Sequence, residues 1–371
     1  MSEPIRVLML FTIMNRGGAE TMVMNYYRHI DRSKVQFDFM VHRQERGAFD
    51  DEIERLGGQI FRMESLSIKH LNKYKKHISS FFNTHPEYRI IHGHCSELGY
   101  FVYKEAAKRN IPVIIAHAHN SHVAFDFKLL FRNWLKHRMR HYLTNFFACG
   151  TESAEWLFGK KLAKQAIIQH NAIDVTEWKF DNNKRKTFRN QLNISDDTIV
   201  IGHVGRFYRQ KNHTFLIDIF NEVHKHTPNS VLLLVGGGDL QQKTKEKVER
   251  LGLSKYVRFM GNRSDVYNWV NAMDVFVFPS LWEGFPASLV EMQANGLYCL
   301  VSSIVPHEVA ITEQVHFVPL AQGAEAWATD TALHMKRMGG CEESYLQVKK
   351  AGYDIKENAC WLQNFYLSVY K

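Results

Sequence analysis

The chain has 371 residues, of which 45% are apolar and 23% are charged. A single domain usually has about 150 residues, so the length predicts two domains, and the globular composition excludes extensive disorder. The formal net charge is +9, with 26 basic and 18 acidic side chains in residues 1–180 but 21 and 20 in residues 181–371. The first half is therefore expected to meet an anionic partner, which could be nucleic acid, a membrane surface or a phosphate-bearing substrate.

Cysteine spacing and the apolar segments exclude further classes of protein. The five cysteines are scattered and form no C-x-x-C pair, so neither a disulfide framework nor a structural zinc site is expected. No apolar run approaches the roughly 20 residues that cross a bilayer. Residues 5–11 lack the small-residue cleavage site of a signal peptide and predict a buried strand. We expect a cytoplasmic protein, either free or attached to the inner face of the plasma membrane.

Short apolar runs alternate with longer amphipathic stretches along the chain. In the first half, strands are predicted at residues 7–11, 35–41, 60–62, 90–92, 113–116 and 146–149, and helices at 19–29, 49–56, 74–83 and 99–108. In the second half, strands are predicted at residues 199–204, 230–235, 257–259, 275–278 and 298–302, and helices at 215–226 and 241–251. Continuous apolar strands that alternate with helices predict parallel sheets covered on both faces.

This alternation predicts an α/β protein of two facing, doubly wound, Rossmann-like domains. The polar segment 179–186 precedes a new strand and marks the boundary between them, so we assign residues 1–178 to the first domain and residues 179–354 to the second. The tail, 355–371, is amphipathic. Ligands of such sheets bind beyond the carboxyl ends of the strands, which makes the residues after each strand the candidates for function.

Glycines follow two of the predicted strands. Gly17 and Gly18 follow the first strand, where an anion-binding turn and a plain strand-to-helix turn are equally favoured. The triplet at residues 236–238 is not spaced as the G-x-G-x-x-G fingerprint of dinucleotide binding. We interpret it as a tight turn at the end of a strand.

Two cations lie in the loop that follows the strand at residues 199–204. Arg206 can bind phosphate oxygens through two parallel hydrogen bonds, and Lys211 supplies a point charge. A solvated loop is the alternative, but Gly205 fixes this loop directly at the end of the sheet. The pair therefore indicates a phosphate site.

Two glutamates flank a predicted helix start in the second half. Pro286 suits the first position of a helix, which places Glu283 in the preceding loop and Glu291 beyond the first turn. Carboxylates accept hydrogen bonds from pairs of hydroxyls, and the free N–H groups of a helix start receive phosphate. The combination favours a nucleotide sugar as ligand, because Trp282 and Phe285 beside the glutamates fit poorly with two plain surface carboxylates.

The glutamate-x7-glutamate motif from Glu283 to Glu291, together with Gly205 to Lys211, resembles the retaining glycosyltransferases of family four, which have the GT-B fold. The resemblance covers nearly the whole chain and is closest to the branch of capsular and exopolysaccharide biosynthesis. The segments that carry it are residues 15–20, 117–120, 149–151, 170–174, 205–206 and 210–212. It implies an acceptor domain, a nucleotide-sugar donor domain, and a C-terminal helix that crosses back to the first domain.

The resemblance implies a role for each matched position. Arg206 and Lys211 would act at the donor diphosphate and stabilise the departing nucleotide. Glu283 would contact the donor sugar, and His119 would lie near the reacting sugar. The other positions are donor-binding (Gly17, Gly18, Asn262, Arg263, Gly284, Phe285, Pro286, Ala287 and Glu291) or candidate acceptor contacts (His94 and Asn120). Many relatives have a Gly-Gly turn before a late glutamate. This turn is absent before Glu308, which leaves the role of Glu308 open.

Neither a metal ion nor a cofactor is expected. The chain has no Asp-x-Asp motif, and the resemblance implies metal independence, with Arg206 and Lys211 in place of a cation at the diphosphate. The pairs His92-x-His94 and His117-x-His119 could place metal ligands on one face of a strand. Because no carboxylate or cysteine cluster accompanies them, we favour core or acceptor-site histidines.

Residues 125–141 combine cations and aromatic side chains at helical spacing. The cations are Lys128, Arg132, Lys136, Arg138 and Arg140. Such a helix is typical of an anionic membrane surface, and a core-facing helix with a solvated basic face is an equal alternative.

The leading prediction is a retaining hexosyltransferase that moves a sugar from a nucleotide-sugar, expected to be a UDP-sugar, to a lipid-linked or saccharide acceptor in bacterial exopolysaccharide or capsule synthesis. A GT-B-fold sugar-nucleotide epimerase is the alternative enzyme, and it would release free sugar without an acceptor. A basic nucleic-acid-binding protein would explain the charge but not the two glutamates, so no nucleic acid is expected as a partner.

Overall fold

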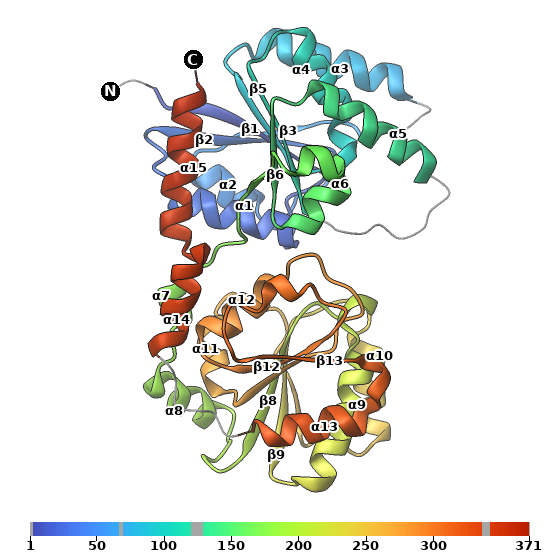
Figure 1. Cartoon of the computed structure of the whole chain (residues 1–371), viewed down its shortest axis with the longest axis vertical. Coiled ribbons are helices and arrows are strands. Elements are labelled where there is room, and N and C mark those ends of the chain that lie inside the picture. The colour runs from blue at the N-terminus through green and yellow to red at the C-terminus, as the bar shows by residue number, and fades with distance from the viewer. Residues whose placement is uncertain (1–2, 67–69, 120–128, 336–341, 371) are drawn as a thin grey trace. The chain divides into compact units, whose positions relative to one another are not determined.

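The fold is described from a computed structural model that covers residues 3–66, 70–119, 129–335 and 342–370 (Figure 1). The chain forms two compact units. The first unit contains residues 1–172 and 355–371, and the second contains residues 173–354.

The first unit is built around a parallel sheet, in which the described residues form seven strands in the order β3-β2-β1-β4-β5-β6-β7. The strands are β1 (Ile5–Phe11), β2 (Val35–Val41), β3 (Ile60–Arg62), β4 (Ile90–Gly93), β5 (Val113–Ala118), β6 (Asn145–Ala148) and β7 (Ile167–Ile168). The helices are α1 (Gly18–His29), α2 (Asp50–Arg55), α3 (Leu71–Thr84), α4 (Tyr100–Lys108), α5 (Leu129–Met139), α6 (Thr151–Ala163) and α15 (Ile355–Val369).

The C-terminal helix α15 belongs to the first unit, as the sequence predicts. It packs against α1 and β2 (Figure 1) and buries Ile355, Leu362 and Tyr366 in the core of this unit. The side-chain oxygen of Gln363 accepts a hydrogen bond from the backbone N–H of Asp31 at 2.9 Å. Segments at opposite ends of the chain thus form one hydrophobic core.

The second unit has its own parallel sheet, and its described strands lie in the order β10-β9-β8-β11-β12-β13. The strands are β8 (Ile199–Val204), β9 (Ser230–Val235), β10 (Val257–Phe259), β11 (Val275–Phe278), β12 (Tyr298–Ser302) and β13 (Val315–Val318). The helices are α7 (Val175–Trp178), α8 (Asn182–Gln191), α9 (His213–His226), α10 (Gln241–Arg250), α11 (Val266–Trp269), α12 (Ala287–Ala294), α13 (Gly323–Leu333) and α14 (Glu342–Val348).

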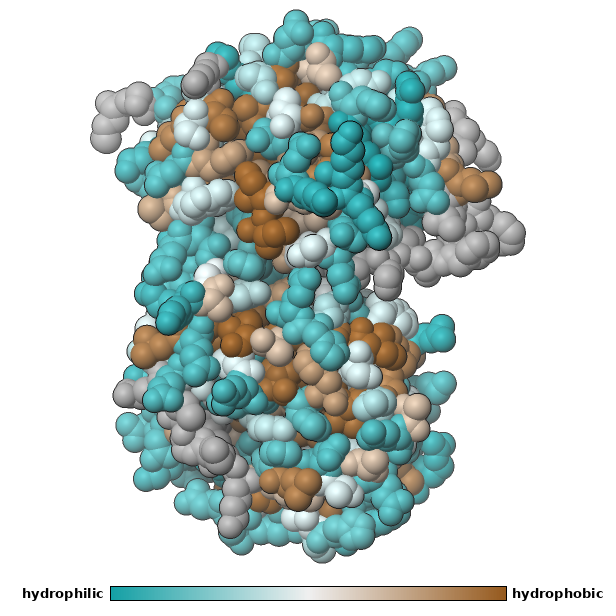
Figure 2. Space-filling model, viewed as in Figure 1, coloured by the Kyte–Doolittle hydropathy of each residue, from teal (hydrophilic) through white to brown (hydrophobic). Residues whose placement is uncertain are grey.

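Each sheet lies between two hydrophobic clusters, which confirms the prediction of parallel sheets covered on both faces. On the face seen in Figure 2, hydrophilic residues cover most of the surface and hydrophobic residues form separate groups. No helix among the described residues combines the length and the apolar character that a membrane span requires.

The second unit begins before the sequence-based boundary at residues 178/179. The side chains of Val175 and Trp178 on α7 are buried in the core of the second unit. A carboxylate oxygen of Asp174 accepts a hydrogen bond from the backbone N–H of Thr176 at 3.1 Å and caps this short helix. The polar segment that suggested the boundary is the start of α8, which lies inside the unit.

Candidate active site

The loop after β8 is fixed by backbone hydrogen bonds to the loop after β9. The N–H of Gly205 donates to the carbonyl of Val235, and the N–H of Phe207 donates to the carbonyl of Gly237, each at 2.9 Å. Phe207 is buried against the ring of His213, while Arg206 between the two anchors is exposed. In the described part of the chain, Arg206 forms no ion pair, and its guanidinium lies 4.9 Å from the ring centre of Tyr208. The fold therefore presents this cation to solvent on a rigid loop.

The glycine triplet after β9 shapes the loop that carries Arg206. Gly236 has a φ of +140°, and a Cβ atom on it would lie 2.1 Å from the carbonyl oxygen of Gly205. Gly238 has a φ of +149°, and its Cβ would lie 2.9 Å from the nitrogen of Phe207. The turn predicted from the sequence is thus also a close contact between two backbones, which only glycine permits.

We expect Gly236→Ala to reduce about 100-fold the transferase activity that the sequence predicts, because an ångström of misplacement in a positioned group costs that much. The new methyl group would push the Gly205 carbonyl and move Arg206. Gly252→Ala is the matched control, since Gly252 also has a positive φ, +72°, but no atom lies within 4 Å of its added Cβ. Both variants place alanine at a positive φ, but only Gly236→Ala adds a clash with another backbone segment, so equal turnover in a steady-state assay would contradict this role of Gly236.

Lys211 and Glu283 form an ion pair between the loop after β8 and the loop after β11. Lys211 Nζ lies 2.7 Å from Glu283 Oε1, and both side chains are largely buried. Gln210 Nε2 donates to Glu283 Oε2 and to the carbonyl of Trp282, each at 3.0 Å. Both oxygens of the Glu283 carboxylate are therefore held by the neighbouring loop.

Gln210 is a positioning residue to which the sequence analysis gave no role. Its carbonyl also accepts a hydrogen bond from the N–H of Leu281 at 2.8 Å, so one residue holds the backbone and the carboxylate of the opposite loop. Two residues further along, Asn212 has a left-handed backbone and donates from Nδ2 to the carbonyl of Pro279 at 3.1 Å. The signals in the sequence were the position of Gln210 beside Lys211 and its place in the segment 210–212, which carries part of the family resemblance.

Helix α12 begins directly after this ion pair. Pro286 precedes the helix in an extended conformation, and the first N–H groups of a helix have no partner within it. Gly284, Phe285, Pro286 and Ala287 thus lead into a helix start, as predicted, and the ring of Phe285 stacks on Tyr353. The helix dipole favours negative charge at this end.

Glu291 lies on α12 beyond its first turn and is partly buried. Desolvation raises the pKa of its carboxyl group to about 7. Glu283 and Glu291 therefore differ: the first is paired with a lysine, whereas the second lies in a poorly solvated place without a charge that lowers its pKa. Hydrogen bonds from the hydroxyl groups of a ligand would stabilise the ionised form of such a carboxyl group in place of the missing water.

Asn262 and Arg263 follow β10, beside the glycine triplet. A Cβ atom on Gly237 would lie 2.9 Å from Asn262 Nδ2, so the amide sits against this turn. Arg263 Nε and Nη2 pair with both carboxylate oxygens of Asp265, at 2.7 and 2.9 Å. The exposed amide of Asn262 therefore lies beside the glycine turn that supports the Arg206 loop, whereas Arg263 is paired with Asp265.

Gly17 and Gly18 form the start of α1 in the first unit. Gly17 precedes the helix, and a Cβ atom on it would lie 2.2 Å from a carboxylate oxygen of Glu20, whereas Gly18 has open space around it. The carboxylate of Glu20 thus lies at this helix start. A Cβ at position 17 would only displace this flexible carboxylate, so the turn remains compatible with either interpretation of the sequence.

His94 and His119 lie together at the ends of β4 and β5 in the first unit. His94 Nδ1 and His119 Nε2 are 2.8 Å apart and share a hydrogen bond. Burial lowers the pKa of His119 to about 3, so its imidazole is neutral at physiological pH. Asn120, the other candidate acceptor contact, lies outside the described residues.

Family comparisons match both units of the chain. Residues 16–177 match the model described as Glycosyltransferase Family 4, and residues 184–354 match the model described as Glycosyl transferases group 1. The chain is 31% identical to the putative glycosyltransferase EpsF of Bacillus subtilis, over 98% of this chain and 97% of that protein.

Two further proteins are informative. The chain is 29% identical to a UDP-Gal:alpha-D-GlcNAc-diphosphoundecaprenol alpha-1,3-galactosyltransferase of Escherichia coli, over 59% of this chain and 58% of that enzyme. The crystal structure of Anabaena Alr3699/HepE in complex with UDP-glucose has the same fold, with a TM-score of 0.78 at 18% identity, over 98% of this chain and 99% of that one. With a relative matched along almost its whole length and a family match in each unit, the chain belongs to the family-four glycosyltransferases of GT-B fold and is a glycosyltransferase.

Proposed function

We propose that this glycosyltransferase is a retaining hexosyltransferase, which moves a sugar from a UDP-sugar to a lipid-linked or saccharide acceptor in the assembly of a bacterial exopolysaccharide or capsule. The observation that carries the donor half of this proposal is the Lys211–Glu283 pair at the start of α12. It combines a cation, a carboxylate and free helix N–H groups at the carboxyl end of a parallel sheet, which is where such folds bind ligands.

On the donor side, the charges match the parts of a nucleotide sugar. Lys211 and Arg206 suit the diphosphate, Glu283 suits the sugar hydroxyls, and Glu291 suits the ribose hydroxyls. Cleavage of the bond from sugar to phosphate develops negative charge on the departing diphosphate, and cations fixed in advance stabilise that charge without reorganising. The same two cations take the role that a metal ion would have.

Glu283 is not proposed as a nucleophile. Lys211 and Gln210 hold both of its oxygens, so its arrangement is that of a binding group that accepts hydrogen bonds from the donor sugar. The retaining outcome is proposed from the family resemblance. A nuclear magnetic resonance assay of the anomeric configuration of the first product tests it, and a product of inverted configuration would refute it.

A panel of sugar nucleotides tests the donor. We expect UDP-sugars to raise the unfolding temperature, whereas GDP- and ADP-sugars leave it unchanged, and mass spectrometry to detect sugar transfer to an undecaprenyl-diphosphate-linked saccharide. The diphosphoundecaprenol acceptor of the Escherichia coli relative and the UDP-glucose complex of the Anabaena structure support these choices. Release of free sugar at the same rate with and without acceptor would favour an epimerase instead.

The affinity for UDP-glucose is expected to rise with pH up to about pH 7. The ionised carboxylate of Glu291 accepts hydrogen bonds from the ribose, and desolvation raises its pKa to about 7. Below that pH the carboxyl group must lose a proton on binding, which weakens affinity by up to tenfold for each pH unit. Isothermal titration calorimetry from pH 5.5 to 8.5 measures this slope.

Glu291→Gln serves as the control. The amide of this variant does not titrate, so its affinity for UDP-glucose should not change with pH. UDP-glucose is the suitable probe, since its phosphates remain ionised over this range. An identical slope in the wild-type protein and in Glu291→Gln would show that another group titrates.

The first unit supplies a surface that suits an anionic membrane. On α5, Leu130 is 84% exposed and Trp134 is 50% exposed, while Leu135 and Met139 on the opposite side are buried. A shallow cavity at the end of α5 and along α6 is lined by cations and histidines together with two apolar side chains, namely His137, Arg140, His141, Lys160, Lys161, Phe158 and Leu162. Apolar anchors next to cations are the composition of a helix that lies at a lipid interface. The part of the predicted helix at 125–128 lies outside the described residues.

Not every cation of this helix is available to lipid. Arg132 donates from Nε to the buried carboxylate of Glu97, and Lys136 lies 4.6 Å from the ring centre of Trp156. Reversing the charge of Arg132 would leave Glu97 buried with a like charge beside it and would destabilise the fold. The exposed apolar residues are therefore the better variants.

We expect the double variant Leu130→Ser and Trp134→Ser to bind vesicles of phosphatidylglycerol and phosphatidylcholine at least about tenfold more weakly, because both buried apolar contacts with lipid are lost. Flotation at low salt measures the bound fraction. Leu333→Ser is the matched control, since Leu333 is 73% exposed but lies on α13 of the second unit. Equal binding of the wild type and the two variants would refute the proposed membrane surface. So would binding of the wild type to vesicles of phosphatidylcholine alone that equals its binding to the anionic vesicles.

A further inference from the structure

Four histidines, three of them buried, form a stack in the first unit. His92 lies on β4, and His94 directly follows the end of this strand. His117 lies on β5, and His119 directly follows the end of that strand. The parallel register pairs Gly93 with Ala116, which aligns His94 with His117 on the same face of the sheet. The ring centres of His92 and His94 are 4.5 Å apart, and those of His94 and His117 are 5.1 Å apart.

The hydrogen bonds of this stack use only part of its nitrogen atoms. His92 Nδ1 bonds to the hydroxyl of Tyr366 at 2.6 Å, and His92 Nε2 lies 3.2 Å from His117 Nδ1. Among the described residues, the Nε2 atoms of His94 and His117 have no hydrogen-bond partner, although both side chains are more than nine-tenths buried. A buried polar atom without a partner costs about 1–3 kcal/mol, so a ligand that bonds to these nitrogens would recover that energy.

The spacing of the ring nitrogens suits a common ligand. His92, His94 and His117 can each present one ring nitrogen such that the three atoms lie within 4.8 Å of one another. Metal–imidazole bonds are about 2 Å long, so small rotations of the rings would bring the three nitrogens to one ion.

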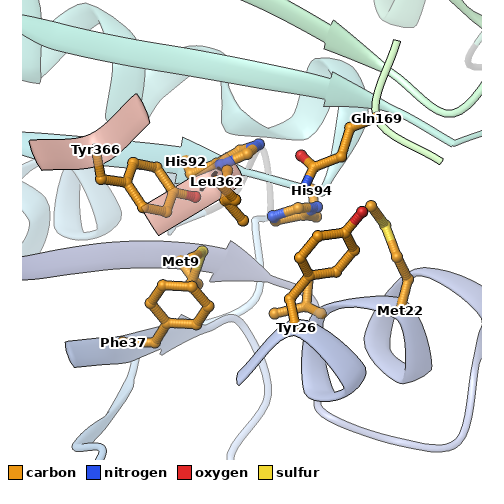
Figure 3. Close-up of a pocket in the computed structure, with 10 residues that line it drawn as sticks. Met9, Met22, Tyr26, Phe37, His92, His94, Gln169, Leu362 and Tyr366 are labelled. Carbon is orange, nitrogen blue, oxygen red and sulfur yellow. Dashed lines mark hydrogen bonds between the residues drawn. The ribbon is translucent and has the colours of Figure 1, made fainter. Parts of the chain in front are cut away.

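The surroundings favour a soft ion of low charge. Within the described chain, the cluster contains histidines only, with no carboxylate to balance a divalent cation, and an unbalanced buried charge is costly. A cavity of about 10 Å³, enough for one small occupant, is lined by His92, His94, Met9 and Met22 (Figure 3). Thioether sulfur is a soft ligand that suits Cu(I), and imidazole also binds copper.

We propose that His92, His94 and His117 form a binding site for a soft monovalent metal ion of the Cu(I) class, beneath α15 in the first unit. In the part of the chain that the structure describes, His94 and His117 each offer a free Nε2, whereas His92 must give up its hydrogen bond to Tyr366 or to His117 in order to bind the ion. Met9 and Met22 line the cavity beside His92 and His94. This metal-binding role differs from the core or acceptor-site role that the sequence favours for these histidines.

Competition with a chromogenic Cu(I) chelator tests the site. We expect the whole protein, kept anaerobic with ascorbate, to remove one equivalent of Cu(I) from bicinchoninate, and Ag(I) to raise its unfolding temperature. His117→Gln and His94→Gln should each weaken Cu(I) binding roughly 100-fold or more. His213→Gln is the matched control, because His213 is a buried histidine of the second unit whose ring nitrogens also have no partner in the described chain.

The unliganded variants are first checked by circular dichroism. If either histidine variant fails to fold, X-ray absorption of the copper-loaded wild-type protein decides, with a first shell dominated by nitrogen as the expected result. Failure to take copper from the chelator, equal binding by His117→Gln and the wild type, or uptake of Zn²⁺ in preference to Cu(I) would each overturn the proposal. If the protein takes no copper from the chelator, the occupant of the cavity is a single water molecule.

Discussion

Lys211→Ala is expected to lower kcat for sugar transfer about 100- to 1,000-fold, the usual loss when a fixed group that stabilises transition-state charge is removed. Lys211 Nζ lies 2.7 Å from Glu283 Oε1 and 4.4 Å from the ring centre of Phe278. The ammonium group is thus held between two loops at the carboxyl ends of β8 and β11. When the donor diphosphate departs, this charge is already in place, so removing it raises the barrier more than it weakens donor binding.

The measurement is steady-state kinetics with saturating acceptor, in which kcat and KM for the donor are separated. Lys225→Ala is the matched control, because Lys225 also pairs with a glutamate at 2.7 Å but is 58% exposed on the surface, and such pairs contribute little. A thermal unfolding curve shows whether loss of the partner of Glu283 destabilises the protein. A Lys211→Ala enzyme with kcat within a few-fold of the wild type would refute the role of this lysine at the diphosphate.

The variant Gln210→Ala separates the positioning of the Glu283 carboxylate from the charge of Lys211. The variant removes both hydrogen bonds of the Gln210 amide, to Glu283 and to the carbonyl of Trp282, but leaves the lysine. A positioning role predicts that KM for the donor sugar rises more than kcat falls.

Asp274→Ala is expected to destabilise the protein by about 3–5 kcal/mol, the cost of breaking a buried ion pair on one side. Asp274 pairs with Arg185 through Oδ1 at 2.5 Å and with Arg189 through Oδ2 at 3.3 Å, and Oδ2 also accepts from the N–H of Val200 at 2.7 Å. Arg189 has no exposed surface. Without Asp274, its guanidinium would stay buried with only backbone carbonyls as partners.

Urea denaturation followed by circular dichroism measures this loss. Asp265→Ala is the control, since Asp265 pairs with Arg263 near the surface, where both side chains are about one-third exposed. The control should change stability by no more than about 1 kcal/mol. A similar midpoint for both variants would show that the buried network of α8 and β11 is not what stabilises the second unit.

The boundary between the units shows where local sequence patterns fail. The polar run at 179–186 looked like a linker, yet Asp181 caps α8 through hydrogen bonds to the N–H groups of Asn183 and Lys184. Trp178 before it is buried in the second core. Polarity along a segment does not distinguish a linker from the exposed start of a helix, because burial of its neighbours depends on residues far away in the chain.

The sequence alone determined the two parallel α/β sheets and the positions of the residues after their strands, because apolar periodicity and glycine or proline punctuation are local properties. It also pointed to Arg206, Lys211, Glu283 and Glu291. Only the tertiary structure decided what each charge does: Arg206 is exposed, Lys211 is paired with Glu283, and desolvation raises the pKa of Glu291 to about 7. The same holds for the first half, where part of the positive charge balances buried carboxylates such as Glu97. Pairing and desolvation depend on groups brought together by the fold, and the spacing of residues along the chain does not encode them.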